Sequence, residues 1–245
     1  YGNTDWYDTF LKKHTTSQEH NMTVSGGGDK VTYYFSANYL EQTGLFKYAD
    51  EEYTRLAING KVRVKFNDKV NFLWSTRLIN TNNDKPTAMN DLFFHNLGRR
   101  SPLMPVYMPN GEYNRESMIP SIREGGRNVQ RNQQLYNQGT LTIEPIKDWK
   151  IYVDINSRLE DPRNSRQFKK VISSLPDGAP EYISVYEGVK PKFEPKEDGS
   201  FNLQPSAGEG VYEQTTGHIN YFNTNAYTDY EKKLGKHYLK ALIGM

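Results

Sequence analysis

The 245-residue sequence has a mean hydropathy of −0.83 and a net charge of +2, and 13% of its residues are aromatic. This aromatic content argues against a disordered chain, and the small net charge gives no indication of a nucleic-acid partner. The absence of cysteine excludes disulfides, thiolate metal ligands and cysteine nucleophiles, and no apolar run reaches the length of about 18 residues that a transmembrane helix requires.

Eight segments alternate between apolar and polar residues with a period of two, which predicts β-strands. In chain order the predicted strands are residues 18–25, 31–40, 53–66, 70–80, 133–144, 149–160, 218–230 and 236–245. Several exceed the usual strand length of about 5–6 residues, and a tilted strand needs about 9 residues or more to cross a bilayer. Strand length therefore favours a membrane-spanning sheet.

The connections between these segments alternate between short and long. Short turns lie at GGGDK (26–30), NDK (67–69), PIKD (145–148) and KKLG (232–235), whereas long connections start at Glu41, Thr81 and Asp161. Long connections inside a compact soluble domain count against the strand assignment, but they suit the outer rim of a barrel wall. The pattern predicts an all-β fold, an antiparallel up-and-down transmembrane β-barrel segment of about eight strands, with residues 81–132 and 161–217 as extracellular loops. Within the first loop, PTAMNDLFFHNLG predicts a helix over residues 86–98.

Alternation gives each strand an apolar and a polar face. In a membrane barrel, Leu56, Ile58 and Val62 face lipid and the charged residues face a wet lumen. The candidates for lining the lumen are Arg55, Lys61, Arg63, Lys65, Arg77, Asp154 and Arg158. These charges either line the path of a solute or pair with one another.

Aromatic residues in the first long loop are candidates for contacts with a substrate or a lid. Phe93, Phe94, Tyr107 and Tyr113 can stack on sugar rings or pack on a peptide, and packing between loops is the alternative. The sequence offers little else that carries chemistry. The five histidines lack metal-ligand spacing, and GGGDK joins two strands without the spacing of a phosphate-binding loop. We therefore expect no enzymatic activity, no metal and no cofactor.

The sequence also resembles a known family. The opening NTDWYDTFLKKHTTSQEHNMTVSGGGDKVTYYFSANYLEQTGLF, followed by YTRLAINGKVRVKFNDKVNFLWSTRL, is similar to the first barrel strands of SusC/RagA-like TonB-dependent outer-membrane transporters of Bacteroidetes. The matching positions are Thr4, Asp5 and Trp6, then residues 20–27 and 33–44, then Tyr53, Arg55 and Asn59. The ending YFNTNAYTDYEKKLGKHYLKALIGM is similar to a later hairpin of the same barrel.

This resemblance implies a 22-stranded barrel with a plug domain in the bacterial outer membrane. It also implies that the charged candidates either line the solute path or pair with the plug as well as with one another. It implies a SusD-like surface lipoprotein as a lid, TonB with ExbB/ExbD as the energy source, and a glycan or oligopeptide as the imported nutrient. No signal peptide, TonB box or plug precedes Tyr1. We therefore expect residues 1–245 to be one contiguous part of the barrel domain.

Two other readings of the same pattern remain open. In a soluble all-β carbohydrate-binding module, the apolar strand faces, which include Leu56, Ile58 and Val62, would pack on one another and form a core. A purely structural or adhesin-like surface barrel would show no dependence on TonB.

Overall fold

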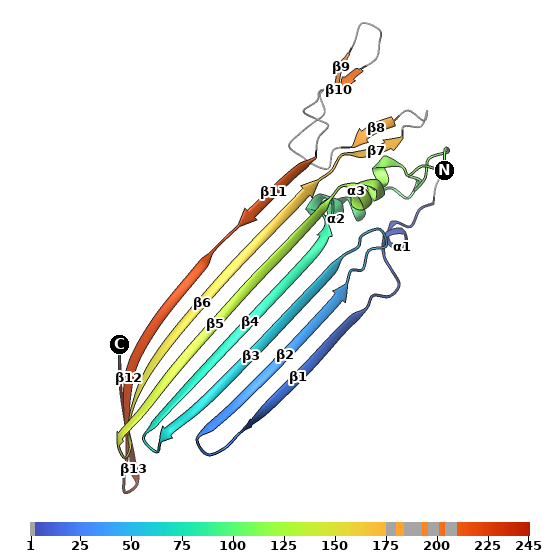
Figure 1. The fold of residues 1–245 in the computed structure, drawn as a ribbon. Helices are drawn as coiled ribbons and strands as arrows, with labels where there is room; N and C mark the ends of the chain where they lie inside the picture. Colours follow the sequence, from blue (N-terminus) through green and yellow to red (C-terminus); the bar gives the residue numbers. More distant parts are fainter. Residues whose placement is uncertain (1–2, 175–179, 184–192, 196–200, 204–209) are drawn as a thin grey trace.

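The computed structural model describes residues 3–174, 180–183, 193–195, 201–203 and 210–245. In this part of the chain one antiparallel sheet runs in the order β1-β2-β3-β4-β5-β6-β12-β13, with β11 also paired to β6 (Figure 1). Its strands are β1 (Ser17–Gly27), β2 (Val31–Thr43), β3 (Glu52–Asn67), β4 (Val70–Pro86), β5 (Arg127–Ile146), β6 (Trp149–Phe168), β11 (Val211–Thr216), β12 (Ile219–Leu234) and β13 (His237–Gly244). The predicted all-β antiparallel architecture, with consecutive strands side by side, is confirmed.

β11 and β12 occupy one position in the sheet. β11 pairs with residues 163–168 of β6 and β12 pairs with residues 149–160 along the same edge. The break lies at Gly217, whose backbone N–H donates to the carbonyl of Pro162 at 2.8 Å. The described sheet therefore has eight strand positions, which match the eight predicted segments in order.

The strands extend further toward the long loops than alternation predicts. β4 continues to Pro86, β5 begins at Arg127 and β6 continues to Phe168, all with regular antiparallel pairing. The predicted loops 81–132 and 161–217 are therefore too long, and the connections leave the sheet only at residues 87–126 and 169–210. Within the second connection, residues 175–179, 184–192, 196–200 and 204–209 lie outside the described part.

The short turns all lie at one end of the sheet, and the helices lie at the other (Figure 1). At the β1–β2 turn, Gly27 has φ +142°, and a Cβ there would lie 2.2 Å from the carbonyl oxygen of Val31. Only glycine fits this turn without strain. At the β12–β13 turn, Gly235 adopts φ +60°, a left-handed conformation that glycine favours, although a Cβ there would meet nothing within 4 Å.

The helices are short. They are α1 (Trp6–Phe10), α2 (Asp91–Leu97), the 3-10 helix η1 (Arg115–Ser117) and α3 (Ile119–Glu124). The predicted helix over residues 86–98 starts later, because Asn90 is the N-cap and its side chain accepts a hydrogen bond from the backbone N–H of Phe93 at 3.0 Å. Two hairpins, β7 (Val171–Ser174) with β8 (Pro180–Ile183) and β9 (Phe193–Pro195) with β10 (Phe201–Leu203), complete the described elements. Across the described residues, every helix is too short or too polar to cross a lipid bilayer.

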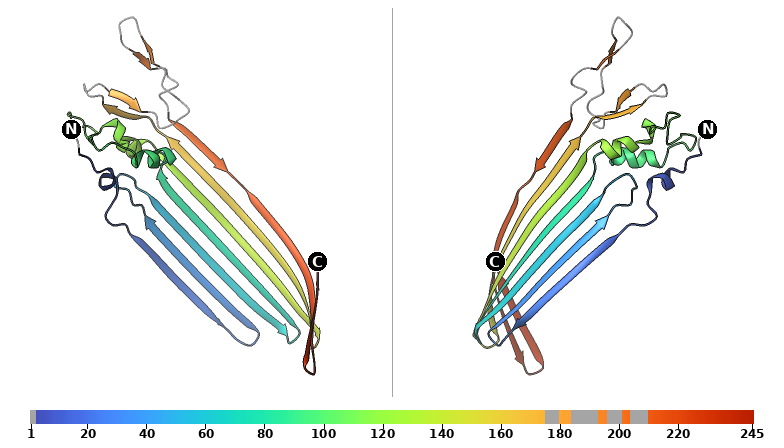
Figure 2. Two further views of the ribbon diagram at one scale, coloured as in Figure 1. Left: turned by 180° about the vertical axis from the view of Figure 1, so that it is seen from behind. Right: turned by 45° about the vertical axis from the view of Figure 1, so that its right-hand side comes forward.

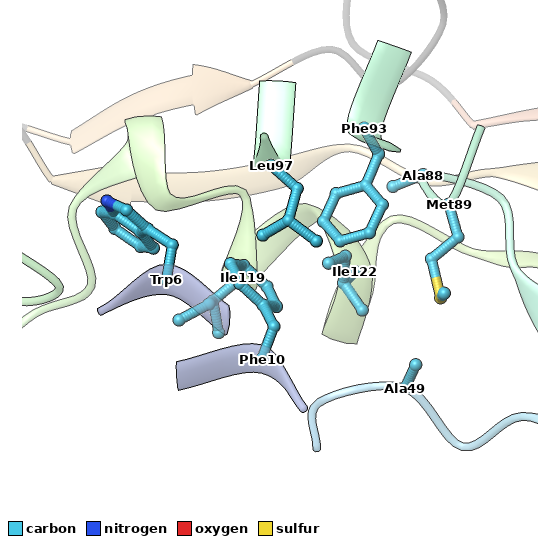
Figure 3. Close-up of a cluster of buried hydrophobic side chains, with 9 residues drawn as sticks. All are labelled: Trp6, Phe10, Ala49, Ala88, Met89, Phe93, Leu97, Ile119 and Ile122. Carbon is cyan, nitrogen blue, oxygen red and sulfur yellow. The ribbon is translucent and has the colours of Figure 1, made fainter. Parts of the chain in front are cut away.

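The hydrophobic core lies beyond the end of the sheet, where α1, α2 and α3 meet (Figure 3). We call this cluster the cap core. Its buried members are Trp6, Phe10, Ala49, Ala88, Met89, Phe93, Leu97, Ile119 and Ile122. Because they come from residues 6–10, 49, 88–97 and 119–122, the cap core joins the segment before β1, the β2–β3 connection and the β4–β5 connection into one packed unit.

The sheet itself has no comparable core. Figure 2 shows it as a single curved layer, and within the described residues no second layer covers its apolar face. Val62, Trp74 and Ile155 on that face are 39%, 41% and 44% exposed. A soluble sheet with this alternation would bury these side chains.

Candidate functional site

The polar face of the sheet carries all seven candidates for lining the lumen. Directly paired residues share a face, and the register pairs Arg77 with both Asn59 and Tyr136, and Tyr136 with Arg158. The remaining five lie on the same face, because residues an even number of positions apart on one strand share a face. Their cross-strand pairs are Arg55 with Leu40, Lys61 with Tyr34, Arg63 with Thr32, Lys65 with Asn71 and Asp154 with Thr140. Alternation in the sequence therefore assigned their common face correctly.

Some of these charges are held by neighbours on the sheet. Arg158 pairs with Glu160, which is 8% exposed and also accepts hydrogen bonds from Asn132 at 2.9 Å and Gln134 at 3.0 Å. Asp154 accepts a hydrogen bond from Thr140 at 2.6 Å. These groups stabilise the sheet.

The remaining five charges on this face differ in their partners: two have one partner each, and three have none among the described residues. Arg55 donates to Asn38 at 3.3 Å and Lys65 forms an exposed ion pair with Asp68 at 2.8 Å. Within the described residues, Lys61, Arg63 and Arg77 have neither an ion pair nor a side-chain hydrogen bond. A hollow of about 600 Å³ is lined by Arg77 and Arg158 together with Tyr136 and Tyr221. The polar face thus combines a fixed network with free cations.

The apolar face forms a band of limited height. On β6 it runs from Trp149 to Leu159, about 33 Å along the strand, or about 25 Å in height at a strand tilt of about 40°. Above Leu159 the same face becomes polar at Asp161 and Arg163. In the middle of the band, the hydroxyl of Thr76 on β4 donates a hydrogen bond to the side-chain oxygen of Asn137 on β5 at 2.8 Å. These two polar side chains therefore have each other as hydrogen-bond partners within the apolar band.

The structure corrects the expectation for Phe93. Its ring is 0% exposed and packs edge-on against Phe10 in the cap core (Figure 3), with ring centroids 5.4 Å apart. It also packs edge-on against Phe46, with ring centroids 5.5 Å apart. No surface of Phe93 is left for a ligand, because the first loop folds onto α1 and buries it.

The other three loop aromatics retain accessible surface. Phe94 is 47% exposed, and Tyr107 is 50% exposed and stacks on Tyr113 with ring centroids 4.9 Å apart. The hydrogen bond with Tyr113 raises the pKa of Tyr107. The structure separates these residues into two places, since Phe94 lies on α2 whereas Tyr107 and Tyr113 flank a tight turn at Gly111.

Arg100, in the connection between β4 and β5, packs on α1. Its guanidinium lies 4.7 Å from the ring centroid of Trp6, and the indole N–H of Trp6 donates to the carbonyl of Ser101 at 2.9 Å. Burial lowers the pKa of Arg100. No sequence pattern singles out Arg100, because its role depends on contacts between segments that are distant in the chain.

A larger hollow of about 910 Å³ lies between α2 and the loop ends of β4, β5, β6 and β11. Phe94 lines it, as do Lys85, Asn128, Arg166 and Glu213. Hydrophobic alternation does not single out these four residues, because they lie in the predicted loops 81–132 and 161–217. Among the described residues, no group of three or more His, Asp or Glu side chains is arranged to hold a metal ion.

Comparisons with known proteins identify a relative. The chain is 28% identical over 154 residues to TonB-dependent receptor P39 of Formosa agariphila, an alignment that covers 60% of this chain and 14% of the relative. The chain therefore spans about one-seventh of that protein's length. No protein-family model matches the chain.

Two solved structures are similar to this chain. They are the RagAB peptide importer in the closed-closed state, with a TM-score of 0.47, and the RagAB peptide transporter, with a TM-score of 0.44. Each is 13% identical in sequence, and the alignments cover 93% and 94% of this chain and 31% of the other chain. The sequence motifs indicate a resemblance to part of a SusC/RagA-like TonB-dependent transporter. The curated relative, which is named a TonB-dependent receptor, agrees with this resemblance.

Proposed function

We propose that the chain forms part of the wall of an outer-membrane, TonB-dependent transporter that imports a large nutrient, an oligopeptide or a glycan. The observation that carries this proposal is the contrast between the two faces of the sheet. One face is an uncovered apolar band of about 25 Å, the height of the lipid-facing band of outer-membrane barrels. The opposite face carries charged side chains, as a water-filled interior requires.

In this proposal the polar face lines the path of the solute. Lys61, Arg63 and Arg77 are available to contact a solute or the carboxylates of a plug, since none has a partner among the described residues. Asp154 and Arg158 are held in the wall network. Arg55 and Lys65 lie on the same face, toward opposite ends of β3.

The cap end of the sheet is the extracellular end in this proposal, because long loops of outer-membrane barrels lie outside and tight turns lie in the periplasm. A SusD-like lipoprotein would close over this end, where Leu103 is 63% exposed and Tyr107 is 50% exposed. TonB with ExbB/ExbD would supply energy through a plug domain.

The test is uptake by cells that carry the full-length gene, a deletion of it, or the gene in a strain without TonB. Labelled oligopeptides and labelled oligosaccharides are offered separately, and surface-bound label is removed before counting. We expect uptake of one class only in cells with both the transporter and TonB. Equal uptake in the deletion strain would overturn the proposal.

The alternative, a soluble carbohydrate-binding module, requires a second layer over the apolar face. Leu56 is 36% exposed and Val62 is 39% exposed in the described structure. Fractionation of the native protein separates the two functions. Recovery in the soluble fraction without detergent would favour the binding module, and recovery in the outer membrane favours the transporter.

A further inference from the structure

The 910 Å³ hollow at the loop end of the sheet, which we call the rim pocket, is built on one row of the strand ladder. Lys85 on β4 is paired with Asn128 on β5, Asn128 with Arg166 on β6, and Arg166 with Glu213 on β11. All four side chains line the rim pocket. Directly paired residues lie about 5 Å apart at their Cβ atoms, so the four groups form one continuous strip.

α2 forms the opposite side of the rim pocket. It contributes Asp91 and Phe94, and both are exposed in the described structure. Phe94 packs edge-on against Phe93 with ring centroids 5.2 Å apart, and Phe93 is fixed in the cap core. The aromatic wall of the rim pocket is therefore held in place by a buried neighbour.

Charges of both signs reach the rim pocket without being neutralised. Among the described residues, Lys85, Arg166, Asp91 and Glu213 have no ion-pair partner within 4.0 Å and no side-chain hydrogen bond. Arg166 and Glu213 are directly paired on neighbouring strands and still form no ion pair. Two cations and two carboxylates are thus available to a ligand in one place.

Asn128 provides an independent sign of a ligand. This residue is 8% exposed, and its side-chain oxygen has no hydrogen-bond partner. A buried polar atom without a partner is unfavourable by about 1–3 kcal/mol, and a donor bound in the rim pocket would satisfy this oxygen.

We propose that the rim pocket binds a zwitterionic oligopeptide, and this inference rests on the proposed function. Arg166 and Lys85 bind carboxylates of the peptide, Glu213 and Asp91 bind its ammonium or guanidinium groups, and Asn128 accepts a hydrogen bond from its backbone N–H. Phe94 packs on an apolar side chain. A neutral glycan supplies hydrogen bonds but leaves all four charges without counter-charges, which makes it a poorer match to this lining.

The experiment uses the full-length transporter in detergent with three probes. The first is a pool of octapeptides with free ends that each contain one lysine and one glutamate. The second is the same pool with capped ends and both residues replaced by glutamine, and the third is maltooctaose. Binding is measured by equilibrium dialysis with mass spectrometry, on the wild type and on Arg166→Gln, Glu213→Gln and Arg163→Gln.

Arg163 is the matched control. It lies three positions from Arg166 on β6, is exposed and belongs to the opposite face of the sheet. We expect Arg166→Gln and Glu213→Gln each to weaken binding of the charged pool by about tenfold to hundredfold, since each removes a charge-assisted hydrogen bond. Arg163→Gln should bind like the wild type. A gel-mobility assay of the unheated protein verifies that each variant is folded.

The outcomes separate this inference from the proposed function. Unchanged binding in Arg166→Gln and Glu213→Gln, or tighter wild-type binding of maltooctaose than of peptides, overturns the rim-pocket proposal. Uptake that still depends on TonB in those cases leaves the transporter proposal intact. Absence of any TonB-dependent uptake by the wild type overturns the transporter proposal itself.

Discussion

At the residue scale, the neighbours Phe93 and Phe94 show how one helix serves two purposes. Phe93 is 0% exposed and joins α2 to Phe10 of α1, whereas Phe94 is 47% exposed and faces the rim pocket. Adjacent residues on a helix point about 100° apart, so one face can pack while the next stays open. The packing of Phe93 in the cap core therefore fixes the position of Phe94 beside the rim pocket.

Replacing Phe93 with alanine should loosen the cap core. Removal of a fully buried phenylalanine destabilises a packed cluster by about 3–5 kcal/mol. Limited proteolysis of the full-length protein in membranes should then cut residues 87–126 at least tenfold faster than in the wild type. Leu103→Ala is the control, because Leu103 is 63% exposed. Equal protection of both variants would show that the cap core does not hold this loop.

The connection between β4 and β5 rejoins the sheet at Gly126, directly before β5 begins. Gly126 has φ +104°, and a Cβ there would lie 1.9 Å from the carbonyl oxygen of Gln167. We expect Gly126→Ala to separate the loop from β6 and to raise its hydrogen exchange, since both the backbone conformation and the close approach require glycine. Gly28→Ala is the matched control, because a Cβ at Gly28 meets nothing within 4 Å. Similar exchange in both variants would contradict the assignment.

At the element scale, each long strand has two parts. Up to Leu159, β6 alternates between apolar and polar residues. Beyond it both faces are mostly polar, while β6 stays paired with β5 as far as Arg166 and with β11 as far as Phe168. Backbone hydrogen bonds hold the second part, so hydrophobic alternation does not reveal it. The rim pocket is built on this second part.

Lysine substitutions on adjacent residues of β6 test the two faces. Ile155 lies in the middle of the apolar band and Asn156 lies on the polar face. Ile155→Lys should destabilise the folded barrel by about 2–4 kcal/mol in lipid, whereas Asn156→Lys should change its stability by less than about 1 kcal/mol. Urea titration in phospholipid vesicles measures both values. Equal effects would mean that the apolar band does not face lipid.

At the scale of the whole molecule, the described sheet is open at β1 and at β13. Each of these strands pairs on one side only within the described residues. Open edges and an uncovered apolar face both promote association with other chains. In a closed barrel, further strands would cover both edges.

Residues 1–245 expressed alone should therefore be insoluble without detergent. We expect the protein in detergent-free buffer to sediment on ultracentrifugation, because both edges and the apolar band associate. Outer-membrane extracts of the native host should yield a protein far larger than 28.4 kDa that contains this segment. A monodisperse 28.4 kDa monomer in buffer would support the soluble binding module instead.

The sequence by itself determined the eight strand positions, the order of short and long connections, and the common face of the seven charged candidates. These features are local, because alternation with a period of two fixes both the strand and the direction of each side chain. Tertiary structure alone decided that Phe93 is buried and that Lys85, Asn128, Arg166 and Glu213 form one row. Those features depend on strand register and on loop packing between residues distant in the sequence, and local alternation contains neither.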